Sequence, residues 1–181
     1  MAKVLVPLAD GCEELEAVTI IDLLRRAGIE VVSAGLNPGV VKASRGVQLV
    51  PDLTLDSALQ DEYDMVVLPG GMPGAAHLKS DPRILRLLKD MAAAGKYTAA
   101  ICAAPMVLAE AGVLEGRQAT SYPGFLDGLP GVTVSAAAVV RDGKVLTSRG
   151  PGTAMDFALA LIETLAGADK RQQVEAALVR P

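Results

Sequence analysis

The stretch from Tyr97 to Pro105, YTAAICAAP, decides how this chain folds. It is a short apolar run that ends at Cys102 and continues into a segment compatible with a helix. A strand that stops at a nucleophilic side chain and turns at once into a helix is typical of a nucleophile elbow, and the small residues beside Cys102 suit such a tight turn. The positive end of the helix would favour a thiolate there. Cys102 is therefore the first candidate for a catalytic residue.

On both sides of this elbow, apolar runs typical of buried strands alternate with amphipathic segments typical of helices. We expect strands at residues 3–9, 30–36, 63–68, 97–102 and 118–122, a hairpin or short ribbon at 40–50, and a hairpin of 132–141 and 144–148 around Asp142-Gly143. Helices are expected at 13–27, 82–94, 105–111, 155–166 and 172–178. This alternation predicts an α/β fold, a doubly wound sandwich with a mostly parallel sheet and helices on both faces, formed by residues 1–181 as a single domain.

The composition agrees with this fold and excludes several classes of function. Hydrophobic residues make up 51% of the chain but aromatic residues only 3%, so the core is built from Ala, Val and Leu, as in parallel strands covered on both faces. A net charge of -4 without a basic run disfavours binding to nucleic acid or a membrane surface. Two cysteines, no secretory signal and no apolar run of membrane-spanning length predict a cytoplasmic protein.

A cluster of acidic residues, Glu13, Glu14 and Glu16, follows the first expected strand. For any one of them, a favourable interaction with the positive end of its helix is a sufficient explanation. Glu13 and Glu16 lie three positions apart and therefore share a helix face. If that face meets the elbow, one carboxyl lies against sulfur, tends to be protonated, and can act as an acid or a base.

A second turn, Leu68-Pro69-Gly70-Gly71, follows the third expected strand. Glycines after a strand are a common turn, but they also leave backbone N–H groups free to face a ligand. With the N–H of Ala103, those of Gly70 and Gly71 could hold a developing oxyanion or the oxygens of an oxidised cysteine.

The remaining candidates have simpler explanations. The single histidine, His77, is best explained as a solvated helix residue, and one histidine supports neither a metal site nor a catalytic triad, so we expect no metal. Cys12 could resolve an oxidised Cys102, but a plain buried cysteine is the favoured interpretation. Arg26 and Arg45 are most simply surface charges, with an anion-binding or subunit-contact role as the alternative.

Four segments in this order, ADGCEELEAV, VVLPGG, AAICAAP and LTSRGPGTAMDFALALIE, resemble the ThiJ/PfpI superfamily. The resemblance is strongest to the clade that holds the parkinsonism-associated deglycase and its bacterial relative YajL. It implies a flavodoxin-like sandwich, a homodimer and a reactive cysteine with a partner carboxylate, which by position are Cys102 and Glu16. It also implies backbone donors at an oxyanion site and arginines near the dimer contact, which by position are Gly70, Gly71 and Ala103, and Arg26 and Arg45.

One position departs from the better-known relatives. Tyr122, in ATSYPG, stands where they carry a histidine close to the cysteine, whereas YajL-type members also carry an aromatic residue. A phenol with a pKa near 10 is a poor base at neutral pH, which weakens hydrolase and protease chemistry. We expect Tyr122 and Glu13 to line the site wall, while Glu16 carries out the proton transfers.

The resemblance implies two functions for one site. The first is a cofactor-independent glyoxalase or protein deglycase that acts on methylglyoxal, glyoxal or their thiol and amine adducts and protects against oxidative stress. The second is a redox-sensing chaperone, a holdase with little turnover, that binds unfolded client proteins when Cys102 is oxidised to a sulfinate. A small-molecule-binding module is disfavoured, because no Gly-rich phosphate loop follows the first strand.

Overall fold

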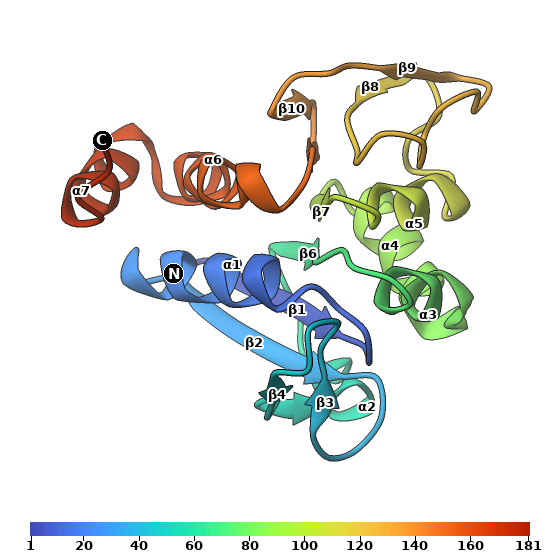
Figure 1. Cartoon of the computed structure of the whole chain (residues 1–181), viewed down its shortest axis with the longest axis horizontal. Helices are drawn as coiled ribbons and strands as arrows, with labels where there is room; N and C mark the ends of the chain where they lie inside the picture. The colour runs from blue at the N-terminus through green and yellow to red at the C-terminus, as the bar shows by residue number, and fades with distance from the viewer.

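The computed structural model describes residues 1–181 and is built around a seven-stranded sheet (Figure 1). Its strands are β1 (Lys3–Leu8), β2 (Glu30–Gly35), β5 (Leu53–Thr54), β6 (Met65–Leu68), β7 (Tyr97–Ile101), β10 (Val139–Asp142) and β11 (Val145–Ser148). Across the sheet they lie in the order β10-β11-β7-β6-β1-β2-β5, and every pair is parallel except the antiparallel pair β10–β11. The chain changes direction across the sheet between β1 and β6, and ligands bind outside the carboxyl ends of strands at such a point.

The helices cover both faces of this sheet. They are α1 (Glu14–Arg26), α2 (Leu55–Ala58), α3 (Gly74–Ser80), α4 (Pro82–Ala93), α5 (Pro105–Glu110), α6 (Ala154–Ala166) and α7 (Ala168–Ala177), with a 3-10 turn, η1, at Pro151–Thr153. Alternate residues of β1 show the two layers: Val4 and Val6 face a core shared with α1, α6 and α7, whereas Leu5 faces one shared with α2 to α5. The mostly parallel α/β sandwich predicted from the sequence is confirmed.

The central strands have no polar face because helices cover them on both sides. All four residues of β6, Met65–Leu68, are fully buried, as are the last three residues of β7. Such strands read in sequence as continuous apolar runs, which is why residues 63–68 and 97–102 could be identified. No helix combines the length and the apolar character that crossing a bilayer requires.

Two small sheets lie outside the main one. The antiparallel pair β3 (Val41–Lys42) and β4 (Gln48–Leu49) confirms the ribbon expected at 40–50. The parallel pair β8 (Arg117–Ala119) and β9 (Val132–Val134) corrects two predictions, because the strand expected at 118–122 ends at Ala119 and the strand expected at 132–141 is two strands. The chain leaves β9 after Val134 and joins β11 only from Val139 onward, so each half pairs with a different sheet.

Several short elements were missed or misplaced by the sequence analysis. Strand β5 and helices α2 and α3 are too short for a periodic pattern to be recognised. Helix α7 begins at Ala168 instead of residue 172, because Gly167, with a φ of 88°, turns the chain directly into it after α6.

Candidate active site

Cys102 occupies a nucleophile elbow at the carboxyl end of β7. Its φ is 65°, a left-handed conformation that costs a non-glycine residue about 1–3 kcal/mol. The surrounding backbone fixes this conformation: the Cys102 N–H donates to the Ser148 carbonyl at 3.0 Å, and its carbonyl accepts from the Tyr122 N–H at 2.8 Å. Helix α5 then begins at Pro105. The elbow predicted from the sequence is confirmed as a backbone feature.

Glu16 reaches this elbow from the first turn of α1. Its side chain is fully buried, and its Oε2 accepts a hydrogen bond of 2.8 Å from the Gly70 N–H. The other carboxyl oxygen, Oε1, has no nitrogen or oxygen partner, while the Cys102 thiol is a hydrogen-bonding neighbour of the carboxyl. The juxtaposition of Glu16 and Cys102 expected from the sequence is therefore present.

Burial controls the ionisation of Glu16. Removing the carboxylate from water raises the pKa of Glu16 to about 7, and the hydrogen bonds from Gly70 and the neighbouring Cys102 offset only part of that rise. The charge of nearby Glu13 raises the pKa further. Both forms of the Glu16 carboxyl are consequently populated at neutral pH, which is the condition in which a group can both accept and return a proton.

The ionisation of the Cys102 thiol differs from the sequence prediction. Burial, and the neighbouring carboxyl of Glu16, raise the pKa of Cys102 to about 12, although the N–H groups of Ala103 and Gly71 act in the opposite direction. The prediction of a thiolate at neutral pH is therefore wrong. The positive end of α5 does not outweigh desolvation, because just 9% of the Cys102 surface is exposed and an acidic group lies beside the sulfur.

The three predicted backbone donors divide into two groups. The N–H groups of Gly71 and Ala103 face the Cys102 sulfur, as an oxyanion site requires. The Gly70 N–H donates to Glu16 instead, so its assignment as a donor at the oxyanion site is wrong. Gly70 is nonetheless required at this place, because a Cβ there would lie 2.7 Å from the Cys102 Cβ and 2.9 Å from the Glu16 Oε2.

Glu13 and Glu14 hold the loop that positions α1. The Glu13 side chain caps α1 by accepting from the Leu15 N–H at 3.2 Å, and its own N–H donates to the Gly70 carbonyl at 2.8 Å. Burial tends to raise the pKa of Glu14, but hydrogen bonds from the Ser44 hydroxyl and the Val47 and Arg45 N–H groups outweigh it and lower the pKa. Glu13 thus connects the Gly70 turn to the start of α1.

Of the other predicted residues, Tyr122 adjoins the elbow, whereas Arg26 and Arg45 lie on other elements. Tyr122 adjoins the elbow through its backbone, and its half-exposed ring meets Phe125 edge-on, with centroids 6.3 Å apart. Arg26 pairs with Asp22 at the end of α1, and Arg45 is exposed on the turn between β3 and β4, so the structure does not bring either arginine to Cys102.

Neither Cys12 nor His77 is a hydrogen-bond partner of the Cys102 thiol, although Cys12 belongs to the same buried cluster as Cys102. Cys12 is fully buried in the same core as α1, and desolvation raises the pKa of its thiol to about 12. The exposed ring of His77 projects from α3 toward the Asp10 carbonyl. No group of three His, Cys, Asp or Glu side chains has the arrangement that would hold a metal ion.

One contributor to the site was missed, namely the Ser148 carbonyl that fixes the elbow. It belongs to the segment LTSRGPGT, which carries a family resemblance but reads structurally as a loop and a helix cap. Because any residue supplies a carbonyl, the sequence contains no signal for this role.

Comparisons with known proteins agree with this geometry. A model described as the DJ-1/PfpI family matches residues 2–164. Protein dj-1beta of Drosophila melanogaster is 47% identical over 178 residues, 97% of this chain and 95% of the fly protein. A crystal structure of Drosophila melanogaster DJ-1beta matches with a TM-score of 0.96 at 45% identity and covers 99% of this chain and 98% of that chain.

Two further relatives bear on the chemistry. Glutathione-independent glyoxalase DJR-1.2 of Caenorhabditis elegans is 37% identical over 172 residues, 93% of this chain and 90% of the worm protein. A structure of Toxoplasma gondii DJ-1, described as oxidized, has a TM-score of 0.95 at 42% identity and covers 99% of this chain and 98% of that chain. On these matches and on the elbow geometry, the chain belongs to the DJ-1/PfpI family, in its DJ-1-like clade.

Proposed function

We propose that this protein is a cofactor-independent glyoxalase that also acts as a deglycase on thiol and amine adducts of dicarbonyls. The observation that carries the proposal is the contact between a buried carboxyl with a pKa of about 7 and the thiol at the elbow. The glyoxalase named among its relatives supports the same chemistry.

The first step uses Glu16 as the base that the thiol requires. Since the Cys102 thiol keeps its proton at neutral pH, the Glu16 carboxylate accepts that proton while sulfur forms a bond to the aldehyde carbon of methylglyoxal. The electrons of the carbonyl double bond move to oxygen, which accepts hydrogen bonds from the N–H groups of Gly71 and Ala103. Protonation of that oxygen by Glu16 gives a hemithioacetal.

The second step moves a proton between the two substrate carbons. Glu16, again a carboxylate, removes the proton from the carbon bonded to sulfur, and an enediolate forms with its charge on the oxygen of the neighbouring carbon. Glu16 returns this proton to the neighbouring carbon, and the hydroxyl proton on the carbon bonded to sulfur passes to the charged oxygen. The product is a thioester of Cys102, which water hydrolyses to lactate and the free thiol. For an adduct, the thiol displaces the amine or thiol held on the same carbon. The bond from Cys102 sulfur to carbon forms, the bond from carbon to the leaving nitrogen or sulfur breaks, and Glu16 passes the thiol proton to the leaving group.

The direct test measures lactate formed from methylglyoxal. The Cys102→Ser variant should lose turnover by about 100-fold or more, because a hydroxyl is a far weaker nucleophile in the same position. Cys12→Ala, which changes the other buried cysteine, is the matched control and should retain turnover. Equal turnover by wild type and Cys102→Ser would remove the cysteine from the reaction.

A redox-sensing function at the same site is supported by a separate observation. The N–H groups that face the sulfur are also suitable partners for sulfinate oxygens, and the structure of the Toxoplasma gondii relative is of an oxidized form. In this second proposal the oxidised protein would bind unfolded client proteins and turn over little substrate.

We further propose that the chain forms a homodimer. Apolar side chains are exposed together on α1 and on the ribbon of β3 and β4, among them Leu15 at 50%, Val18 at 47% and Val47 at 49%. Exposed apolar side chains grouped in this way mark interaction surfaces. Arg26 and Arg45 lie on the same two elements, consistent with the subunit-contact role expected from the sequence.

A further inference from the structure

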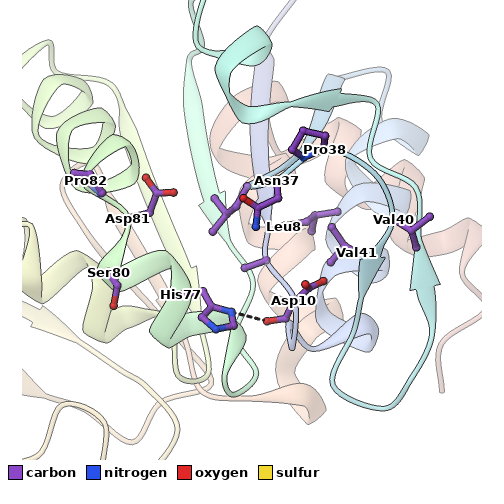
Figure 2. Close-up of a pocket in the computed structure, with 12 residues that line it drawn as sticks. Leu8, Asp10, Asn37, Pro38, Val40, Val41, His77, Ser80, Asp81 and Pro82 are labelled. Carbon is purple, nitrogen blue, oxygen red and sulfur yellow. Dashed lines mark hydrogen bonds between the residues drawn. The ribbon is translucent and has the colours of Figure 1, made fainter.

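A cavity of about 380 Å³ lies between the carboxyl ends of β1 and β2 and the helices α3 and α4 (Figure 2). Leu8, Asp10, Asn37, Val41, His77 and Ser80 are among the residues that line it. It shares no residue with the site around Cys102, and its volume falls in the range of sites for small ligands. The cavity therefore needs an explanation of its own.

The lining of this cavity contains one carboxylate without a charged partner. Asp10 accepts a hydrogen bond of 2.9 Å from the Lys42 N–H through Oδ1, but it forms no ion pair. The second acid in the lining, Asp81, is fully engaged by Arg83, whose guanidinium lies 2.6 Å from Oδ2. Asp10 is therefore the acid that remains free to meet a cation.

The neighbouring polar groups include several that can accept hydrogen bonds. The His77 Nδ1 lies 3.0 Å from the carbonyl oxygen of Asp10, which can only accept, so Nδ1 carries the proton (Figure 2). With the proton on Nδ1, the nitrogen that can accept in the neutral tautomer is Nε2. The side chains of Asn37 and Ser80 also line the cavity, whereas no lysine or arginine does. The cavity therefore offers an anionic ligand no lysine or arginine side chain.

Aliphatic side chains make up another part of the lining. They belong to Leu8, Leu36, Val40 and Val41. This surface suits a short apolar group, while the Asp10 end suits a donor with a positive charge. We propose that the cavity binds a small organic cation, a primary ammonium group carried on a short apolar chain, with the ammonium at Asp10 and the chain against the valines.

The test compares two probes of similar shape and opposite charge, phenethylamine and 3-phenylpropionate. Titration of each into the protein, followed by calorimetry and amide chemical-shift changes, should show the amine binding at least ~10-fold more tightly than the acid. The amide signals of Asp10, Leu36 and His77 should move, and raising the salt concentration should weaken binding. Tighter binding of the acid, or shifts confined to the surroundings of Cys102, would overturn the proposal.

Two variants test the role of charge in opposite directions. Asp10→Asn keeps an oxygen for the Lys42 N–H but removes the charge, and should weaken binding of the amine by about 10-fold. Asn37→Asp adds a carboxylate to the lining and should strengthen it. The control is Asp90→Asn, which removes the same single charge at an exposed position on α4. It should bind the amine with the affinity of wild type. Unchanged affinity in Asp10→Asn and Asn37→Asp would contradict the proposal.

The cavity can be tested independently of the proposed enzyme activity. The Cys102→Ser protein should bind phenethylamine with the same affinity as wild type, because the two sites have no residue in common. Loss of lactate formation in Asp10→Asn is not expected. Loss of amine binding in Cys102→Ser would show that the probe enters the thiol site instead, and would overturn the assignment of this cavity.

Discussion

The Glu16 carboxyl lies against the Cys102 thiol with one oxygen bound by the Gly70 N–H and the other without a nitrogen or oxygen partner. Burial disfavours the charged form of both groups, and the Glu16 carboxyl further disfavours a thiolate at Cys102. The pair therefore rests with its thiol protonated and its carboxyl divided between two forms at neutral pH. Proton transfer within the pair, and not a preformed thiolate, is the basis of the proposed reaction.

Replacing Glu16 with glutamine should change how stability depends on pH. The raised pKa means that the folded protein keeps this proton up to about pH 7, whereas the unfolded chain releases it near pH 4.5, so wild type loses stability as pH rises between these values. Glu16→Gln lacks this titration. The free energy of unfolding of Glu16→Gln should therefore rise, relative to that of wild type, by on the order of 3 kcal/mol between pH 4.5 and pH 8.

Urea unfolding at several pH values measures this difference directly. The exposed Glu62→Gln is the matched control, in which the difference from wild type should stay constant with pH. A constant difference for Glu16→Gln as well would mean that Glu16 is not a buried group with a raised pKa.

Adding a methyl group at Gly70 should damage the site and the fold together. The new Cβ would lie 2.7 Å from the Cys102 Cβ and 2.8 Å from the Ile101 carbonyl, so backbone must move. We expect Gly70→Ala to lose about 1–3 kcal/mol of stability, measured by denaturant unfolding, and most of its turnover. Gly152→Ala, which places its Cβ in open space, should be close to wild type in both measurements. Full activity in Gly70→Ala would show that this close contact is not required.

Mild peroxide should oxidise Cys102 before Cys12. Cys102 is partly open to solvent and its sulfur is faced by two N–H groups, whereas Cys12 is fully buried. Peptide mass analysis should find two added oxygens, about +32 Da, on Cys102 first. Oxidation that begins at Cys12 or at the methionines would count against the redox-sensing proposal.

An acidic residue on α1 should separate the proposed dimer. Val18 is half exposed on the apolar surface of α1, and burying a charge there at a subunit contact is unfavourable. Val18→Asp should sediment as a monomer at concentrations where wild type sediments as a dimer. Val179→Asp changes a more exposed valine near the C-terminus and should leave the assembly unchanged. A monomeric wild type would refute the dimer.

The sequence was sufficient for the fold and for the two side chains at the centre of the site, Cys102 and Glu16. Apolar runs such as residues 63–68 identify central strands because both of their faces are covered, and the small residues around Cys102 identify the elbow. Ends of elements were less predictable. The strand expected at 118–122 stops at Ala119, where the next N–H, that of Thr120, donates to the Thr147 hydroxyl, a contact between distant parts of the chain.

The electrostatics of the site could not be read from the sequence. A helix N-terminus predicts a lowered thiol pKa, but the depth of burial and the nearness of Glu16 decide its direction, and both depend on tertiary packing. The same holds for Gly70, whose N–H could serve either an oxyanion or Glu16. The cavity beside Asp10 also arises only when β2, α3 and α4 come together.

The most direct test measures the thiol pKa and the turnover of the same two proteins, wild type and Glu16→Gln. Removing the carboxyl should lower the pKa of Cys102 from about 12, because one cause of its rise is gone, and yet reduce lactate formation by about 100-fold or more, because the base is gone. A more acidic thiol with undiminished turnover, or an unchanged pKa, would contradict the claim that Glu16 takes the proton from Cys102.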